Sequence, residues 1–246
     1  MNKIKLKNID TKAPEKINKG DCKFELDKIL QELFGLQHLF YASHTYSLLI
    51  IFQGIDTAGK DSTIRQVFSG VNPLGVHATS FKAPIGNELE HDYMWRIFQK
   101  LPEKGKIQIF NRSYYEDILV PTIQKTLPNN IIEGRYDFIN AFEEHLLSNN
   151  TIVLKFFLHI SEEEQKKRIQ ERMNDPFKKW KYSEGDRQSS KKWKEYKKVY
   201  EQILNRCSSE LPWVIVPADN KWYRNYIVAS TIVATLKKLN LKFPKK

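Results

Sequence analysis

The sequence is poor in cysteine. Its 246 residues include two, Cys22 and Cys207, which lie far apart along the chain. No Cys-x-x-Cys spacing is present, which argues against a disulfide framework and against a cysteine-ligated zinc site. Free thiols persist in reducing compartments, so we expect a cytoplasmic protein.

Long apolar segments are also missing. No stretch approaches the roughly 20 apolar residues that span a bilayer, and the basic segment 1–7 has no apolar core of the kind found in secretory signals. Apolar residues make up 41% and charged residues 28% of the chain, a composition that is typical of neither disordered nor membrane proteins. We therefore expect one α/β domain with no membrane partner.

Acidic residues are scarce relative to basic ones. The chain has 29 Asp and Glu against 40 Lys and Arg, and its formal net charge is +11. The excess is concentrated at 165–198 and 221–246. It favours association with polyanions such as nucleic acid, nucleotides, anionic lipid or chains of inorganic phosphate. A solvated basic face without a ligand remains the alternative.

A glycine-framed loop directly follows the apolar run 47–52, which reads as a buried parallel strand. The residues of this loop are Gly54, Ile55, Asp56, Thr57, Ala58, Gly59, Lys60, Asp61 and Ser62. Such a turn between a strand and a helix gathers backbone N–H groups at the positive end of the helix dipole, and a lysine adds a mobile charge. The G-x4-G-K spacing is that of a P-loop and predicts a phosphate-binding site.

Two carboxylates distinguish this loop. Asp61 stands where a Ser or Thr usually places a hydroxyl on magnesium, and capping of the following helix is one role open to it. Ser62 is one residue late for that hydroxyl, so we do not assign it to metal. Asp56 would repel phosphate unless a cation lay between them. We predict that Asp56 holds magnesium or positions an acceptor phosphate, with capping of a turn as the alternative.

A second group of polar residues follows the apolar run 106–110. Asn111, Arg112, Glu116 and Asp117 come at the carboxyl end of this predicted strand, where ligands bind in open α/β sheets. A carboxylate in this region completes the magnesium shell of many P-loop proteins, which favours Asp117 with Glu116 beside it. The planar guanidinium of Arg112 suits a phosphate in transfer.

The apolar pattern predicts alternating strands and helices. We expect strands at 47–52, 76–81, 106–110, 151–158 and 213–216, and helices at 22–43, 62–69, 88–99, 136–147, 161–173, 187–204 and 223–239. The strands show no polar alternation, which indicates a sheet covered on both faces. The predicted fold is a P-loop kinase-like, doubly wound parallel sheet. We expect a basic N-terminal arm at 1–20 and a single phosphotransferase domain at 21–246.

The segment 168–198 has the composition of a lid. Its two charged helical stretches are separated at Asp175-Pro176 and carry few apolar residues, so they should pack weakly and close over substrate. Aromatic residues between the charges either stack on a base or anchor the lid. The six histidines show no ligand spacing and read as structural.

Several motifs together resemble the polyphosphate kinase 2 family. They are Gly-x-Asp-x-x-Gly-Lys at 54–60, Gly-Val-Asn-Pro-x-Gly-Val at 70–76, Phe-Lys-Ala-Pro at 81–84, Asn-Arg-Ser-x-Tyr-Glu-Asp at 111–117, Asp-Pro-x-x-x-Trp-Lys at 175–181 and Pro-Ala-Asp-x-Lys-Trp-Tyr-Arg-Asn at 217–225. The resemblance runs from about residue 20 to 240, nearly the whole chain. Within the family, the Asn-Arg-Ser and Lys-Ala-Pro segments are similar to those of the class that accepts both AMP and ADP.

The resemblance implies reversible phosphoryl transfer between inorganic polyphosphate and AMP, ADP or ATP, with Mg²⁺ or Mn²⁺. By this comparison Asp56 and Asp117 would organise metal and phosphates, while Lys60 and Arg112 would neutralise charge. The residues that would line the polyphosphate path are Lys82, Arg172, Lys181 and Arg224. Family members commonly form dimers or tetramers, which implies a homodimer or homotetramer.

Two other interpretations fit parts of the sequence. An ATP-dependent P-loop kinase of a small metabolite would use the same loop with little use of polyphosphate. A basic nucleic-acid-binding module would explain the charge but not the paired phosphate-loop and strand-end motifs. We therefore do not expect nucleic acid as a partner.

Overall fold

The protein folds around one sheet of parallel strands, seen in a computed structural model that describes residues 3–177, 179–182, 184–208 and 210–245. The five strands have the order β2-β3-β1-β4-β5, and every neighbouring pair is parallel. Their bounds are β1 Ser47–Gln53, β2 Val76–Ser80, β3 Ile107–Asn111, β4 Thr151–His159 and β5 Trp213–Pro217. All five lie at the positions that the sequence predicts.

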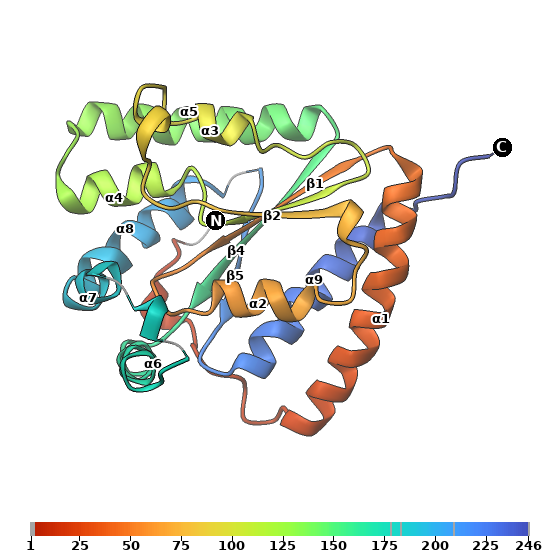
Figure 1. Cartoon of the computed structure of the whole chain (residues 1–246), viewed down its shortest axis with the longest axis horizontal. Helices are drawn as coiled ribbons and strands as arrows, with labels where there is room; N and C mark the ends of the chain where they lie inside the picture. The colour runs from red at the N-terminus through yellow and green to blue at the C-terminus, as the bar shows by residue number, and fades with distance from the viewer. Residues whose placement is uncertain (1–2, 178, 183, 209, 246) are drawn as a thin grey trace.

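Helices cover both faces of this sheet (Figure 1). Helices α1, α2 and α9 pack together on one side, and α4, α5 and α8 form the layer on the other. The helices are α1 Lys19–Ser43, α2 Lys60–Val67, α3 Trp95–Phe98, α4 Glu116–Gln124, α5 Asn129–Ser148, α6 Glu162–Asn174, α7 Glu184–Lys191, α8 Trp193–Arg206 and α9 Lys221–Lys238. The predicted doubly wound α/β fold is confirmed. No described helix is long and apolar enough to cross a membrane.

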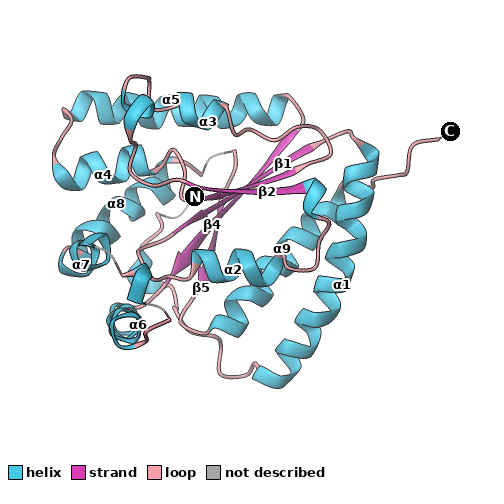
Figure 2. Ribbon diagram, in the orientation of Figure 1, coloured by secondary structure: helices cyan, strands magenta, loops and turns pink. Residues whose placement is uncertain are grey.

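Strand β1 forms the centre of the core. It lies between β3 and β4, and all seven of its residues are buried. Each large apolar side chain buried in this way contributes about 1.5–3 kcal/mol. The continuous apolar run therefore fixes the strand that leads into the phosphate-binding loop at its carboxyl end (Figure 2).

Two predicted helices are divided in the structure, and the predicted helix 136–147 begins earlier, at Asn129. Instead of one helix at 88–99 there is a 3₁₀ turn, η3 Gly86–Leu89, followed by the single turn of α3. The Asp92 carboxylate accepts from Met94 N at 2.9 Å and starts a new turn there. The predicted helix 187–204 is divided into α7 and α8 at Lys192, whose φ of −101° and ψ of 26° depart from helical values.

Helix α4 lies outside the predicted elements because it contains Pro121, which removes one backbone donor. The carbonyl oxygen that this donor would normally reach is that of Asp117. The Arg135 guanidinium on α5 donates to that oxygen instead. A contact between two helices therefore replaces the hydrogen bond that proline removes, and this compensation is invisible in the local sequence.

The N-terminal arm is fastened to the domain. Leu6 is buried, and its carbonyl oxygen lies 3.1 Å from Nε2 of His159 at the end of β4. Thr11 Oγ1 donates to Asp219 Oδ2 at 2.8 Å, and Ala13 N donates to the side-chain oxygen of Asn220 at 2.8 Å. The arm thus runs along the carboxyl ends of β4 and β5.

Candidate active site

Two cavities meet at the carboxyl ends of β1 and β3. The first, here called the phosphate pocket, has a volume of about 470 Å³ and is lined by Asp56, Thr57, Gly59, Lys60, Asp61, Ser62, Ser80, Phe81, Lys82, Asn111, Arg112, Arg172, Trp180 and Tyr182. The second, here called the apolar pocket, has a volume of about 370 Å³. Asp56, Phe81, Lys82 and Arg112 line both. The structure therefore brings the loop and strand-end motifs of the sequence together.

The phosphate-binding loop needs glycine at both ends. Gly54 and Gly59 have φ values of 151° and 106°. A Cβ atom at Gly54 would lie 2.8 Å from the Leu158 carbonyl oxygen, and one at Gly59 would lie 1.9 Å from Arg224 Nη1. Both positions combine positive φ with close packing, which excludes any larger residue.

Lys60 is buried at the base of the pocket, where its Nζ donates to the Gly54 carbonyl oxygen at 2.7 Å. Burial and the charge of Arg112 lower the pKa of Lys60, while the carboxylates of Asp56 and Glu116 oppose them. A bound phosphate would add negative charge and favour the ammonium form. The lysine is thus positioned to hold a phosphate at the loop.

Asp56 forms an ion pair with Arg112 across the mouth of the pocket. Burial alone raises the pKa of Asp56, but the charges of Arg112 and Lys60 outweigh it and the pKa lies below its usual value. Arg112 itself has a φ of 64°, a left-handed conformation that aims its side chain back at the loop. The pair keeps an ionised carboxylate and a guanidinium side by side at the junction of the two cavities.

The Asp61 side chain does not cap α2. Gly59 occupies the N-cap position, and the Asp61 carboxylate accepts a hydrogen bond from the Asn111 amide at the end of β3. The Ser62 hydroxyl donates to the Gly59 carbonyl oxygen at 2.9 Å and accepts from Arg224 Nη2 at 3.0 Å. These contacts join the two motifs and occupy the Ser62 hydroxyl within the protein.

Glu116 and Asp117 line the apolar pocket. Burial raises the pKa of Glu116, and it raises the pKa of Asp117 to about 6 against the opposing charges of Arg96 and Arg135. Asp117 Oδ2 is buried and lies 3.7 Å from Arg96 Nη2. It has no hydrogen-bond partner among the described residues. An oxygen in this state has capacity for a further ligand.

The residues predicted to hold metal are two carboxylates, those of Asp56 and Asp117. No group of three or more His, Cys, Asp and Glu side chains able to hold a metal exists within the described residues. Mg²⁺ is often bound through one or two carboxylates together with substrate phosphates and water. Asp56 lines both pockets and pairs with Arg112, whereas Asp117 lines the apolar pocket and has its Oδ2 3.7 Å from Arg96 Nη2, so magnesium binding by these two carboxylates stays a prediction.

Two arginines support the phosphate-binding loop by hydrogen bonds to its carbonyl oxygens. Arg168 on α6 donates through Nη1 to the carbonyl oxygens of Thr57 and Ala58 at 3.0 and 3.1 Å. Its Nη2 reaches the carbonyl oxygens of Ala218 and Asp219 at 2.8 and 2.9 Å. Arg168 is outside the predicted site residues, because its contacts depend on chain segments remote from it in sequence.

Arg224 is the second arginine beneath the loop, and its position corrects the prediction. It is 1% exposed and donates through Nη1 to the Ala58 carbonyl oxygen at 3.2 Å. Burial and the neighbouring charge of Arg168 lower its pKa to about 9. Arg224 lines neither pocket, so it supports the loop instead of lining a polyphosphate path.

The predicted lid contributes to the site in part. Arg172, Trp180 and Tyr182 line the phosphate pocket together with Lys82. The side chain of Lys181 lies outside the described residues. The beginning of the predicted lid, at Arg168, is bonded to the loop as described above. Closure over substrate therefore concerns the residues that follow it, and it stays a prediction.

The apolar pocket combines hydrophobic walls with a few polar groups. Its apolar and aromatic lining comprises Ile55, Phe81, Ala83, Pro84, Leu119, Val120, Pro121, Tyr196 and Tyr200. Its polar and charged lining comprises Asp56, Lys82, Arg96, Arg112, Glu116, Asp117 and Gln124. This arrangement is typical of small-molecule sites and suits a nucleoside whose phosphates point toward Arg112.

A buried network anchors the strand-end motif. The hydroxyls of Tyr114 and Tyr115 both donate to Glu143 Oε1 at 2.7 Å. Lys155 Nζ donates to Glu143 Oε2 at 2.5 Å and to the Cys207 carbonyl oxygen at 2.7 Å. The sequence does not predict this network, because the apolar strand pattern around Lys155 gives no sign of its partner on α5.

Known proteins share this architecture. A family model described as polyphosphate kinase 2 matches residues 16–244. An AMP/ADP-polyphosphate phosphotransferase of Meiothermus ruber is 44% identical and covers 87% of this chain and 80% of its own length. An ADP-polyphosphate phosphotransferase of Rhodopseudomonas palustris is 39% identical, and the match covers 98% of this chain and 93% of that protein. The crystal structure of polyphosphate kinase 2 from Arthrobacter aurescens TC1 matches 100% of this chain and 89% of its own, with a TM-score of 0.96 and 36% identity. This chain therefore belongs to the polyphosphate kinase 2 family.

Proposed function

We propose that the protein transfers the terminal phosphoryl group of inorganic polyphosphate to AMP and to ADP, forming ADP and ATP reversibly. The observation that carries the proposal is the meeting of a phosphate pocket and an apolar pocket at Asp56 and Arg112. A phosphate chain suits the charged lining of the first pocket, and a nucleoside suits the apolar and aromatic lining of the second. The relatives named above, which act on polyphosphate with AMP or ADP, support the same pair of substrates.

In the proposed reaction, an oxygen of the acceptor's terminal phosphate attacks the terminal phosphorus of polyphosphate. The bond from that phosphorus to the bridging oxygen breaks, and polyphosphate leaves one unit shorter. Such transfer depends on positioning and charge stabilisation more than on covalent help from the protein. Lys60 holds donor phosphate at the loop, and Arg112 stabilises the charge that spreads over the transferred group.

Asp56 and Asp117 would hold the Mg²⁺ or Mn²⁺ that the family resemblance implies. When bound, the metal supplies neutralisation of phosphate charge. Asp56 also orients Arg112 through their ion pair. Lys82 and Arg172 extend the basic lining of the phosphate pocket away from Lys60, which suits a donor with many phosphates. We also propose that the protein is a homodimer or homotetramer in the cytoplasm.

The test is ATP formation from AMP and from ADP, assayed separately with long-chain polyphosphate and Mg²⁺ and no other phosphate donor. Product from both acceptors supports the proposal, and product from ADP alone would contradict the dual-acceptor part. An ATP-dependent kinase of a small metabolite would give no product in either assay, including with Mn²⁺.

A further inference from the structure

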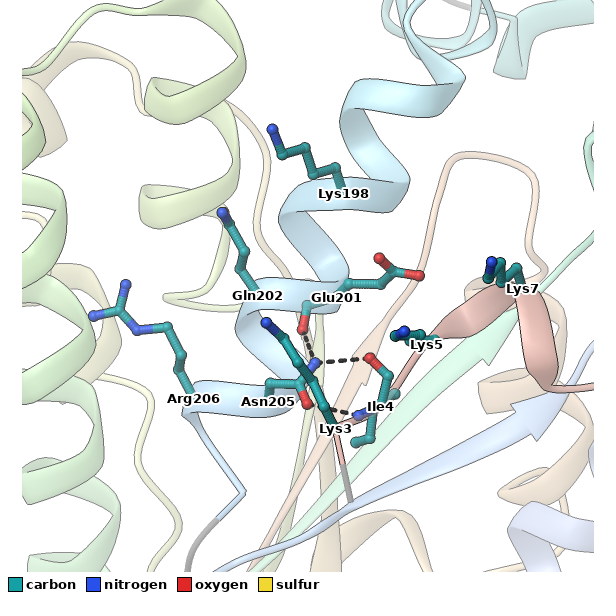
Figure 3. A pocket seen from close by; sticks show the side chains of 9 residues that line it. All are labelled: Lys3, Ile4, Lys5, Lys7, Lys198, Glu201, Gln202, Asn205 and Arg206. Atoms are coloured by element: carbon teal, nitrogen blue, oxygen red, sulfur yellow. Dashed lines mark hydrogen bonds between the residues drawn. The ribbon is translucent and has the colours of Figure 1, made fainter. Parts of the chain in front are cut away.

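A third cavity, separate from the two just described, lies between the N-terminal arm and α8 (Figure 3). It has a volume of about 690 Å³ and is lined by Lys3, Ile4, Lys5, Lys7, Lys198, Glu201, Gln202, Asn205 and Arg206. We propose that this basic pocket binds a distal segment of the polyphosphate chain whose end is at the active site. The inference rests on the function proposed above.

The charge of the pocket is uncompensated. Lys3, Lys5, Lys7 and Lys198 are exposed, and none forms an ion pair with a residue that the structure describes. Glu201 is the one carboxylate in the lining, and its Oε1 accepts a hydrogen bond from Leu6 N at 2.8 Å. Four free ammonium groups around one cavity produce a strong positive potential that attracts an anion of several charges.

Arg206 has a different role at the edge of this pocket. Its Nη1 and Nη2 donate to the Glu133 carboxylate at 2.9 and 2.6 Å, and its guanidinium lies 3.7 Å from the centre of the Tyr136 ring. It is therefore held toward α5. The ligand charge must be met by the lysines, which bind phosphate as mobile point charges.

The arm is held in place by contacts that do not involve its lysines. The Asn205 side chain accepts from Ile4 N at 2.7 Å and donates to the Ile4 carbonyl oxygen at 2.9 Å, and both bonds are drawn in Figure 3. The buried Leu6 adds an apolar anchor. Because docking of the arm does not use the lysines, their charges stay available. Lys5 has extended backbone, and Lys7 lies in the 3₁₀ turn Leu6–Asn8 that follows it.

The ligand chemistry follows from what the lining provides. It contains no aromatic side chain, so a base would find no surface to stack on. Four of its polar groups are ammonium donors on the N-terminal arm and on α8, which fit a row of phosphates. The protein's proposed donor is such a chain.

The position of the pocket requires a long chain. Tyr196 and Tyr200 on α8 line the apolar pocket, whereas Lys198 and Gln202 line the basic pocket. Two residues along a helix correspond to a rotation of about 200°, so these pairs lie on opposite sides of a helix about 10 Å across. A polyphosphate that is too short to reach around this helix cannot occupy both sites. Long polyphosphate can pass around the helix and gain affinity because its second contact is intramolecular.

The test compares two variants with four Lys→Gln substitutions each, which keep the side-chain stems and remove four charges. The pocket variant carries K3Q, K5Q, K7Q and K198Q. The control variant carries K100Q, K238Q, K242Q and K245Q, at exposed lysines that line none of the three cavities. Circular dichroism melting of both variants verifies that the fold is intact.

The pocket variant should raise KM for long-chain polyphosphate by about tenfold or more, with kcat and the KM for short-chain polyphosphate unchanged. The control variant should behave like the wild type. Equal KM values for long chains in the two variants would overturn the inference, and so would an equal rise for short and long chains. A wild-type protein with no turnover on any polyphosphate would refute the proposed function. In that case, direct binding of long-chain polyphosphate, weaker in the pocket variant than in the control, would still establish the pocket.

Discussion

Replacement of Glu143 by glutamine should destabilise the protein strongly and impair catalysis through a residue outside both pockets. The side chains of Glu143 and Lys155 are 4% and 1% exposed, and they form an ion pair of 2.5 Å. Glutamine keeps an oxygen for the two tyrosine hydroxyls but presents an amide to the ammonium. A buried charge that loses its partner in this way costs about 3–5 kcal/mol. That is a large fraction of the stability of about 5–15 kcal/mol typical of a folded domain.

Urea unfolding followed by circular dichroism measures the loss as a lower midpoint at unchanged slope. E133Q serves as the matched control, because the Glu133–Arg206 pair lies at the surface and its removal should leave the midpoint unchanged. Adding K155M to E143Q removes the orphaned ammonium and should recover part of the loss. A midpoint for E143Q equal to that of E133Q would refute the reasoning.

Three further predictions concern the site itself. R112A should lower kcat by about 10³-fold or more with little change in the urea midpoint; turnover within tenfold of the wild type would contradict the role of Arg112. G59A should weaken polyphosphate binding and cost about 1–3 kcal/mol, since its Cβ would lie 1.9 Å from Arg224 Nη1; an unchanged KM and melting temperature would argue against it. D117N should abolish transfer yet stabilise the metal-free protein at neutral pH, and equal melting temperatures with the wild type at pH 7 would contradict this.

The sign of the Asp117 effect follows from its pKa. Burial raises that pKa from the usual 3.8 to about 6, so the folded state binds the proton more tightly than the unfolded chain. The ionised group therefore lowers stability by about 3 kcal/mol above pH 6, and this penalty disappears below about pH 4. The stabilisation by D117N should be present at pH 7 in EDTA and absent near pH 3.5. A carboxylate retained at this cost is consistent with a functional requirement.

The sequence by itself determined the strands and the two motifs of the site. Most of the strands are largely apolar runs, with the polar β2 as the exception, and the phosphate-binding loop is a contiguous segment whose spacing dictates its own backbone conformation. The residues Asn111 to Asp117 were assigned to the same site because carboxyl ends of parallel strands share one edge of the sheet. Each of these inferences uses interactions within a short stretch of chain.

Only the tertiary structure decided which charged residues line the pockets and which support the phosphate-binding loop. Arg224 and Arg172 look alike in sequence, but the first is buried beneath the loop and the second lines the phosphate pocket. Arg168 and the Glu143–Lys155 pair acquire their roles from segments brought near by the strand order β2-β3-β1-β4-β5. The carbonyl oxygens and carboxylates that bind an arginine are those that tertiary packing places near it. The local sequence pattern therefore does not predict them.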